Sequence, residues 1–473
     1  MDQLTYLIAF LVLMALVAIV PAMVRRWHVP AVVAIMACGI LIGPHGLHVL
    51  TSIANFIGSG VSGADLLRVV DALGFLGLVF LMALAGVETD LRMLANEKRA
   101  VTSLSILTFA LPAAAGYLVY WLFDKTNPIS AWVYASLFAS HSIGIVFPVI
   151  REMGLVRSRF GIAVLSSTVI TDILSLILLA VCVQLQVFMH PDLSMTTGLS
   201  LLNHVDFSWM GAGWFTVAFI AVIILFVVSV LFLVPFLWRA VEWFLPKGDE
   251  SKVTFFVLVV LLIVLAGELI GVNLIVGAFV AGMAIARTPG FRKADEDALE
   301  TQLLMLPKHD NIHHKLEAVG FGLMVPFLFL SVGFKADIGV LFGLGEGASA
   351  TRNLLIAGAT VIGLVFSKVM SGWLAMRLSG FGNRQGVCAG LMTVPQLSAT
   401  IAAAAVALEL QLLDEVFFNA IIVLSLATTL PVPTMVRLLI ARSGVSFDTS
   451  DRGTAAIREA TSEAEREHLD MTV

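Results

Sequence analysis

Two distant stretches of the chain read almost alike: Phe80–Leu91 is FLMALAGVETDL, and Phe327–Ile338 is FLFLSVGFKADI. Each stretch closes a long apolar segment. The two align without a gap, and the alignment matches Phe80 with Phe327, Gly86 with Gly333, and Asp90 with Asp337. The likeness indicates that the chain contains an internal repeat. Chance similarity between two apolar helix ends is the alternative.

The repeat can be placed among the apolar segments of the whole chain. Hydropathy predicts thirteen transmembrane helices, each able to cross a hydrocarbon core of about 30 Å. Their predicted ranges are 4–25, 29–48, 66–89, 100–123, 129–150, 158–188, 211–244, 252–270, 272–288, 315–335, 351–379, 384–409 and 413–441. The matching stretches close the third and the tenth helices, and an offset of seven helices reverses direction across a membrane. We therefore predict two inverted six-helix repeats within a transmembrane domain at 1–442: repeat one at 1–190 and repeat two at 252–442, joined by a linker helix at 211–244.

Composition and charge agree with a membrane protein. Of the 473 residues, 59% are hydrophobic and 13% are charged, whereas soluble domains carry roughly a quarter of charged residues. The fold class is therefore all-α and membrane-spanning. Lys and Arg collect in alternate loops, which predicts an N-terminus outside and a C-terminus in the cytoplasm. The opposite face keeps only Arg68, Lys125, Lys335 and Arg352.

Polar breaks interrupt two of the predicted helices at matching positions of the repeats. The fifth helix carries SHSIG at Ser140–Gly144 before Pro148, and the twelfth carries TVPQLS at Thr393–Ser398. Proline and serine favour non-helical geometry, and such backbone at membrane depth is tolerated only beside protein or water. We predict two discontinuous helices that cross near the midplane, although plain kinks are an alternative. The candidate residues of the crossing segments are His141, Ser140, Ser142, Gln396 and Ser398.

Asp172 lies near the middle of the sixth predicted helix, in a stretch rich in Ser and Thr. A charge at that depth costs about 2.5–3.5 kcal/mol on insertion scales, so it should face the interior and serve a function. Thr168 lies one turn earlier on the same face. Carboxylate, hydroxyl and carbonyl oxygens suit a small alkali cation, and burial lets a proton compete for the carboxylate. We therefore predict a site at which a monovalent metal cation and a proton alternate on Asp172. A purely structural aspartate is the alternative.

Lys368 is the second charge deep within a predicted span. We predict that it pairs with Asp172 and stabilises the site when no cation is bound. A lysine that snorkels to the interface or one that caps helix carbonyls remains an alternative. His141 is either a pH sensor or a plain hydrogen-bond partner. Glu88, Glu268 and Glu409 lie at span ends, where they anchor helices or line an access route.

These residues lie within several further motifs. They are GILIGPHGL at Gly39–Leu47, LAGVETDL at Leu84–Leu91, GE at Gly267–Glu268, VGAFVAG at Val276–Gly282 and SVGFKAD at Ser331–Asp337. Across roughly residues 5–441, the sequence resembles the monovalent cation:proton antiporter superfamily. The resemblance is to its second branch, which includes bacterial sodium/proton antiporters and ligand-gated potassium efflux systems.

The resemblance implies a homodimer in which each protomer has a dimerisation domain and a core domain that moves like an elevator. It implies that Asp172 is the ion-binding aspartate, that Thr171 and Thr168 belong to the same site, and that Lys368 is the core lysine. Ser142 and Gln396 then lie in the two crossing segments. The implied activity is exchange of Na⁺, with K⁺ or Li⁺ as alternatives, for H⁺ across a bacterial inner membrane.

The chain departs from its relatives in ways that bear on coupling. Relatives with two adjacent acids resemble electrogenic exchangers, whereas this chain has Thr171 before Asp172. Ile143 and Pro395–Gln396 replace an acid and an arginine of some relatives. We therefore predict one-for-one, electroneutral exchange.

Other function classes are less consistent with the sequence. A ligand-regulated potassium efflux system is the nearest alternative, but the tail at 443–473 has no Gly-rich strand-turn-helix for a nucleotide. An enzyme would need a nucleophile and base or a metal cluster near the surface. We expect no cofactor, no nucleotide-binding domain and no nucleic-acid partner. Lipid surrounds the protein, and Cys38, Cys182 and Cys388 are expected to be packing residues.

Overall fold

The structure is a computed structural model of the 473-residue chain. It describes residues 2–24, 31–57, 61–88, 98–142, 158–189, 211–242, 249–288, 312–342 and 349–429, together with positions 146, 149, 150, 155, 291, 431, 432, 435, 436 and 439. The predicted tail at 443–473 lies outside these residues, as do Ile143, Gly144 and Pro148 of the first crossing segment.

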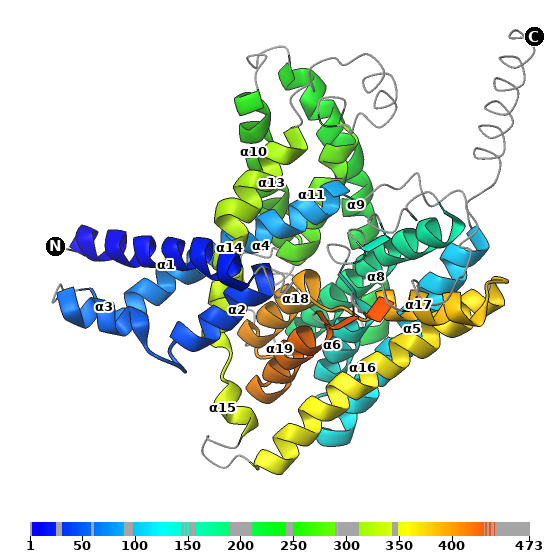
Figure 1. Cartoon of the computed structure of the whole chain (residues 1–473). Coiled ribbons are helices and arrows are strands. Elements are labelled where there is room, and N and C mark those ends of the chain that lie inside the picture. The colour runs from blue at the N-terminus through cyan, green and yellow to red at the C-terminus, as the bar shows by residue number, and fades with distance from the viewer. Residues whose placement is uncertain are drawn as a thin grey trace, which may run out of the picture.

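The described part of the chain is all helical (Figure 1). Its first half contains α1 (Asp2–Val24), α2 (Ala31–Ile42), α3 (Val49–Ile57), α4 (Gly63–Glu88), α5 (Lys98–Phe123), α6 (Pro128–Ala139) and α8 (Arg159–Met189). Its second half contains α9 (Ala212–Glu242), α10 (Asp249–Leu269), α11 (Leu274–Ala286), α13 (Ile312–Val319), a π-helical turn (Gly320–Met324), α14 (Val325–Lys335), α15 (Ile338–Leu341), α16 (Ala350–Leu378), α17 (Asn383–Met392), α18 (Ser398–Glu409) and α19 (Glu415–Thr429).

Eight described helices are long and apolar enough to cross a membrane, and five shorter ones are apolar. The chain is therefore an integral membrane protein, as predicted, while the count of thirteen spans stays a prediction. The sequence missed the short helices α3 and α15. It also made the second helix too long, because Gly43 begins a turn in which the amide of His48 donates back to the Gly43 carbonyl.

Close helix crossings hold one side of the bundle together. Helix α4 packs along α11 and α14, and α14 packs along α2. A methyl group added at Gly86 would lie 2.0 Å from the Phe279 carbonyl oxygen, and one at Gly333 would lie 2.5 Å from that of Met36. Because lipid is as apolar as the helices, close approach of small residues is a main source of association inside a membrane. The glycines of both matching stretches thus lie at helix crossings.

A second group of helices surrounds the interrupted segments. The long helix α16 runs alongside α5, and α6 and α8 pack against α5 from other directions (Figure 1). A methyl group at Gly372 would lie 2.2 Å from the Cα atom of Gly390, so α16 and α17 also cross closely. The three cysteines are buried and free, as expected for packing residues.

Both predicted interruptions are present. Helix α6 ends at Ala139, and Ser140, His141 and Ser142 are not helical. Helix α17 ends at Met392, and α18 begins only at Ser398. At the end of α6 the Ser140 amide still donates to the Ser136 carbonyl, but the Ser140 backbone is extended and ends the helix. In the other segment, Pro395 lacks the amide that an uninterrupted helix would need.

Candidate functional site

The two interrupted segments meet through their backbones. The amide of Ser142 donates to the carbonyl oxygen of Pro395 at 3.1 Å. The side-chain amide of Gln396 donates to the carbonyl oxygen of Ser140. Both bonds use polar groups that a continuous helix would have satisfied internally. The described parts of the two segments are therefore joined directly by hydrogen bonds.

Hydroxyl groups complete this crossing. The Ser140 hydroxyl lies 2.7 Å from that of Thr400, and the Thr400 hydroxyl donates to Oε1 of Gln396. Both hydroxyl residues are at most 4% exposed. Sequence analysis missed Thr400, although its position one turn after Gln396 on α18 places both side chains on one face. The side chain of Ser398, another candidate, lies outside the described residues.

Asp172 on α8 faces this crossing. It is 8% exposed, and its Oδ1 accepts a hydrogen bond from the His141 amide at 3.1 Å. An amide freed by the end of α6 therefore points at the carboxylate. Asp172 therefore faces the interior of the protein, as predicted.

Thr168 and Thr171 lie on α8 beside Asp172 and are fully buried. The Thr168 hydroxyl donates to the Val164 carbonyl at 2.9 Å, and the Thr171 hydroxyl lies within 3.0 Å of two carbonyls of the preceding turn. A hydroxyl that has given its proton to a helix carbonyl still has oxygen lone pairs. Both oxygens thus remain chemically suited to a cation.

Lys368 on α16 is fully buried, but it does not form the predicted ion pair with Asp172. Its ammonium group donates to the carbonyl oxygens of Ala139 at 2.7 Å and Ser140 at 2.9 Å. These carbonyls lie at the C-terminal end of α6, where the helix dipole favours a positive charge. Lys368 therefore binds the carbonyls at the end of α6 instead of pairing with Asp172. Its position is that of the alternative, a lysine that caps helix carbonyls.

His141 is fully buried and contacts both α8 and α16. Its Nδ1 is 3.2 Å from the Lys368 ammonium, and its Nε2 is 3.1 Å from the Thr171 hydroxyl. The structure thus brings together Asp172, Thr171, His141 and Lys368. These residues, with Ser140, Ser142 and Gln396, are all sites that the sequence predicted. No group of three or more His, Cys, Asp or Glu that could hold a metal ion occurs within the described residues.

Comparison with known proteins identifies the family. A sequence profile described as sodium/hydrogen exchanger, transmembrane, matches residues 12–442. The chain belongs to the sodium/hydrogen exchanger family.

Individual family members and a solved structure agree with this assignment. A probable Na⁺/H⁺ antiporter of Methanocaldococcus jannaschii is 29% identical over 92% of this chain and 96% of its own length. A Na⁺/H⁺ antiporter of Synechocystis sp. is 28% identical over 91% of this chain, which spans 54% of that protein. The structure of a sodium proton antiporter from M. jannaschii at pH 8 has a TM-score of 0.55 at 12% identity and covers 97% of this chain and 99% of its own. At this level of identity, the similarity shows that the two proteins share a fold.

A cavity of about 150 Å³ opens at one end of this family member's helix bundle. It lies where α4 begins and where α8, α10, α14 and α18 end. Its lining includes seven residues with polar or charged side chains: Asp71, Gln184, Glu268, Asn273, Ser331, Lys335 and Glu409. Sequence analysis left Glu268 and Glu409 as helix anchors or as lining of an access route, and it assigned no site role to the other five. The ammonium of Lys335 pairs with Glu409 and lies 3.8 Å from Asp71. Glu88 and Asp90, by contrast, have side chains outside the described residues.

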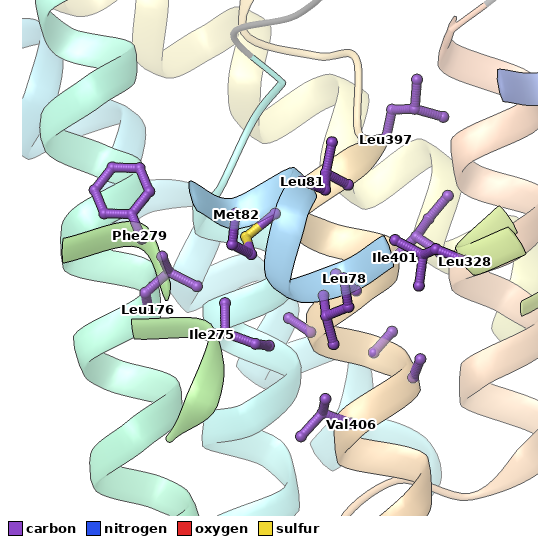
Figure 2. Close-up of a cluster of buried hydrophobic side chains, with 14 of the residues drawn as sticks. Leu78, Leu81, Met82, Leu176, Ile275, Phe279, Leu328, Leu397, Ile401 and Val406 are labelled. Atoms are coloured by element: carbon purple, nitrogen blue, oxygen red, sulfur yellow. The ribbon is translucent and has the colours of Figure 1, made fainter. Parts of the chain in front are cut away.

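Figure 2 shows a cluster of buried apolar side chains, three of which also line this cavity. Val183 of α8 lines the cavity, and Asp172 lies eleven residues earlier, about 16 Å along the helix. Leu176, one turn after Asp172, belongs to the same buried cluster as Leu78, Leu328 and Val406, which line the cavity. We call this set the apolar cluster: Leu78, Leu81, Met82, Leu176, Ile275, Phe279, Leu328, Leu397, Ile401 and Val406. Along α8, Leu176 of the apolar cluster lies between Asp172 and the cavity-lining Val183.

Proposed function

We propose that the chain is a secondary antiporter that exchanges Na⁺ for H⁺, with Asp172 binding the two ions in turn. The position of Asp172 is the observation that carries the proposal. Within the described residues it is the only buried carboxylate, and it lies where two interrupted helices cross. Membership in the sodium/hydrogen exchanger family supports the same activity.

The chemistry of this site favours competition between the two ions. A carboxylate removed from water is costly unless its charge is neutralised, and either a proton or a metal cation can do this. The oxygens of Thr168 and Thr171 and the carbonyls freed at the crossing are hard ligands of the kind that alkali cations prefer. Proton binding therefore releases the cation, and cation binding releases the proton.

We further propose a one-for-one, electroneutral exchange. Thr171 stands where some relatives have a second acid, and it carries no charge. A single carboxylate that exchanges one Na⁺ for one H⁺ moves no net charge in a full cycle. An imposed membrane potential should leave the flux in proteoliposomes unchanged, while a pH gradient should drive it. Flux that follows the potential would contradict the stoichiometry and leave the exchange itself intact.

Alternating access to Asp172 is part of the proposal. The cavity lies on the side that the distribution of basic residues assigns to the outside, and three residues of the apolar cluster contribute to its lining. Release from the cavity side requires the apolar cluster to part, and release to the cytoplasm requires it to remain closed. In this scheme α8 and α18 move with the crossing, past α4 and α14.

We also propose that the protein works as a homodimer in the inner membrane of a bacterium, with its C-terminus in the cytoplasm. Large apolar side chains on α1 and α9 are exposed and need either lipid or a second copy against them. Examples are Leu7 and Met23 on α1 and Trp214 and Phe232 on α9. Chemical cross-linking in membranes, with and without solubilisation, distinguishes a dimer from a monomer.

Proton flux in everted vesicles tests the central proposal. Vesicles containing the wild type should release protons when Na⁺ is added, and comparison with K⁺ and Li⁺ gives the preference among cations. Asp172→Asn removes the only carboxylate that is buried among the described residues and should abolish the response. Asp71→Asn at the cavity is the matched control and should keep most of it. Normal transport by Asp172→Asn would overturn the proposal.

A further inference from the structure

We propose that His141 is a permanently neutral bridge between Lys368 and the helix that carries Asp172, and that it does not take up a proton during transport. The inference rests on the proposed exchange at Asp172, because it assigns a positioning role within that site. The proposal excludes the alternative role of His141 as a pH sensor that gains and loses a proton.

The contacts of His141 connect three elements of the site. Its backbone amide donates to Asp172 on α8, its Nε2 lies beside the Thr171 hydroxyl on the same helix, and its Nδ1 lies beside Lys368 on α16. The residue itself lies just beyond the end of α6. A single side chain thus links the interrupted helix to both of the helices that carry the buried charges.

The hydrogen bonds of Lys368 determine which ring nitrogen carries the proton. An ammonium group has three protons and accepts none. Its three nearest acceptors are the Ala139 carbonyl at 2.7 Å, the Ser140 carbonyl at 2.9 Å and Nδ1 of His141 at 3.2 Å, while the Thr108 carbonyl lies at 3.5 Å. Nδ1 therefore accepts from the lysine, and the ring proton is on Nε2.

The rest of the network runs in the same direction. With its proton on Nε2, the ring donates to the Thr171 hydroxyl oxygen at 3.1 Å. The Thr171 hydroxyl passes its own proton to the Ser167 or Thr168 carbonyl, at 2.9 and 3.0 Å. Every donor from Lys368 to the backbone of α8 then has an acceptor. The bridge also holds the Thr171 hydroxyl proton away from the carboxylate.

The other tautomer fits poorly. With its proton on Nδ1, the ring would donate to the Ala139 carbonyl at 3.4 Å, which already accepts from Lys368 at 2.7 Å. That proton would face an ammonium proton across 3.2 Å. A doubly protonated ring is worse, because it would place two positive charges at that distance between two fully buried side chains. Lys368 and Asp172 are the charged groups that face the ring from α16 and α8.

Two substitutions separate a neutral bridge from a pH sensor. His141→Gln keeps a neutral side chain with one acceptor and one donor, whereas His141→Leu keeps the bulk and removes both. A neutral bridge predicts that the glutamine variant retains the wild-type pH midpoint of transport, whatever its maximal rate. The leucine variant replaces the acceptor at 3.2 Å by nothing closer than the Thr108 carbonyl at 3.5 Å, so the ammonium form of Lys368 is less well stabilised and supports the Asp172 carboxylate less well. Its midpoint should move to alkaline pH by about one unit, the result of a tenfold change in proton affinity. Equal shifts in both variants would overturn the bridge.

Nitrogen NMR of histidine-labelled protein provides a measurement independent of transport. The His141 signals are assigned by their loss in His141→Gln. We expect an unprotonated Nδ1 and a protonated Nε2 throughout the pH range in which transport changes. A doubly protonated ring in that range, or a proton on Nδ1, would overturn the inference. Because this measurement needs no flux, it remains decisive even if Asp172→Asn shows that the proposed exchange is wrong.

Discussion

The buried crossing and the cavity use the same kinds of charged group in opposite surroundings. At the crossing, Lys368 is fully buried and is bonded to carbonyl oxygens of an interrupted helix. At the cavity, the Lys335 side chain is 25% exposed and pairs with carboxylates of Glu409 and Asp71, which are 58% and 48% exposed. At the crossing, protein groups take the place of water around the charge of Lys368. At the cavity, the charge of Lys335 remains partly exposed to solvent.

This difference determines how much each charge matters. A charge whose solvent is a fixed set of protein dipoles cannot be removed without leaving those dipoles unpaired. A charge beside water can be replaced, because water takes over its partners and salt screens what remains. The same substitution should therefore have large effects at the crossing and small effects at the cavity.

Exchanging each lysine for methionine should show the largest contrast. Lys368→Met removes the ammonium donor from the buried carbonyls of Ala139 and Ser140 and from Nδ1 of His141, and should cost about 3 kcal/mol of stability, with loss of transport. Lys335→Met should cost less than about 1 kcal/mol and preserve transport. Thermal unfolding of both variants in the same detergent, followed by vesicle flux assays, measures the two effects. Equal losses in both variants would remove the distinction between the regions.

The next contrast concerns uncharged amides. Gln396→Leu removes the donor to the Ser140 carbonyl and the acceptor of the Thr400 hydroxyl, and should cost about 1–2 kcal/mol. Gln184→Leu is the matched control and should cost less, because Gln184 is 6% exposed and lines the cavity but takes no part in the hydrogen bonds of the crossing. Unfolding temperatures of the two variants in one detergent make the comparison. A larger loss in the cavity variant would mean that the crossing is not held by its side-chain bonds.

The smallest effect is expected for the exposed ion pair. Glu409→Gln breaks the bond between α14 and α18, while Lys335 still has Asp71 nearby. The apparent KM for Na⁺ should change less than about fivefold at low ionic strength. The change should vanish as salt is raised, because exposed charges are screened. A larger effect that persists in high salt would show that this pair belongs to the transport site.

Much of the buried crossing could be predicted from local sequence. Pro395 and the serines of Ser140–Ser142 interrupt apolar segments, and a helix cannot continue through residues that lack an amide or compete for its carbonyls. The cost of a charge in lipid indicated that Asp172 faces the interior. The inverted repeat and the two-domain arrangement remain predictions, although the repeat's glycines lie at helix crossings.

The cavity residues could not be recognised in the same way. Asp71 and Lys335 lie near helix ends, where charged residues are common and usually only anchor the helix in the membrane. Their proximity arises because α4, α14 and α18 come together in the fold. No spacing within one helix carries that information.

The sequence by itself determined that this chain crosses a membrane, where its helices break and which carboxylate is buried, because these follow from hydropathy and local backbone chemistry. Only the tertiary structure decided the partner of Lys368. The sequence offered Asp172 as the opposite charge, whereas the fold places the end of α6 against the ammonium group. Two carbonyls and a ring nitrogen at 2.7–3.2 Å satisfy all three of its protons, and His141 becomes its connection to the helix of Asp172.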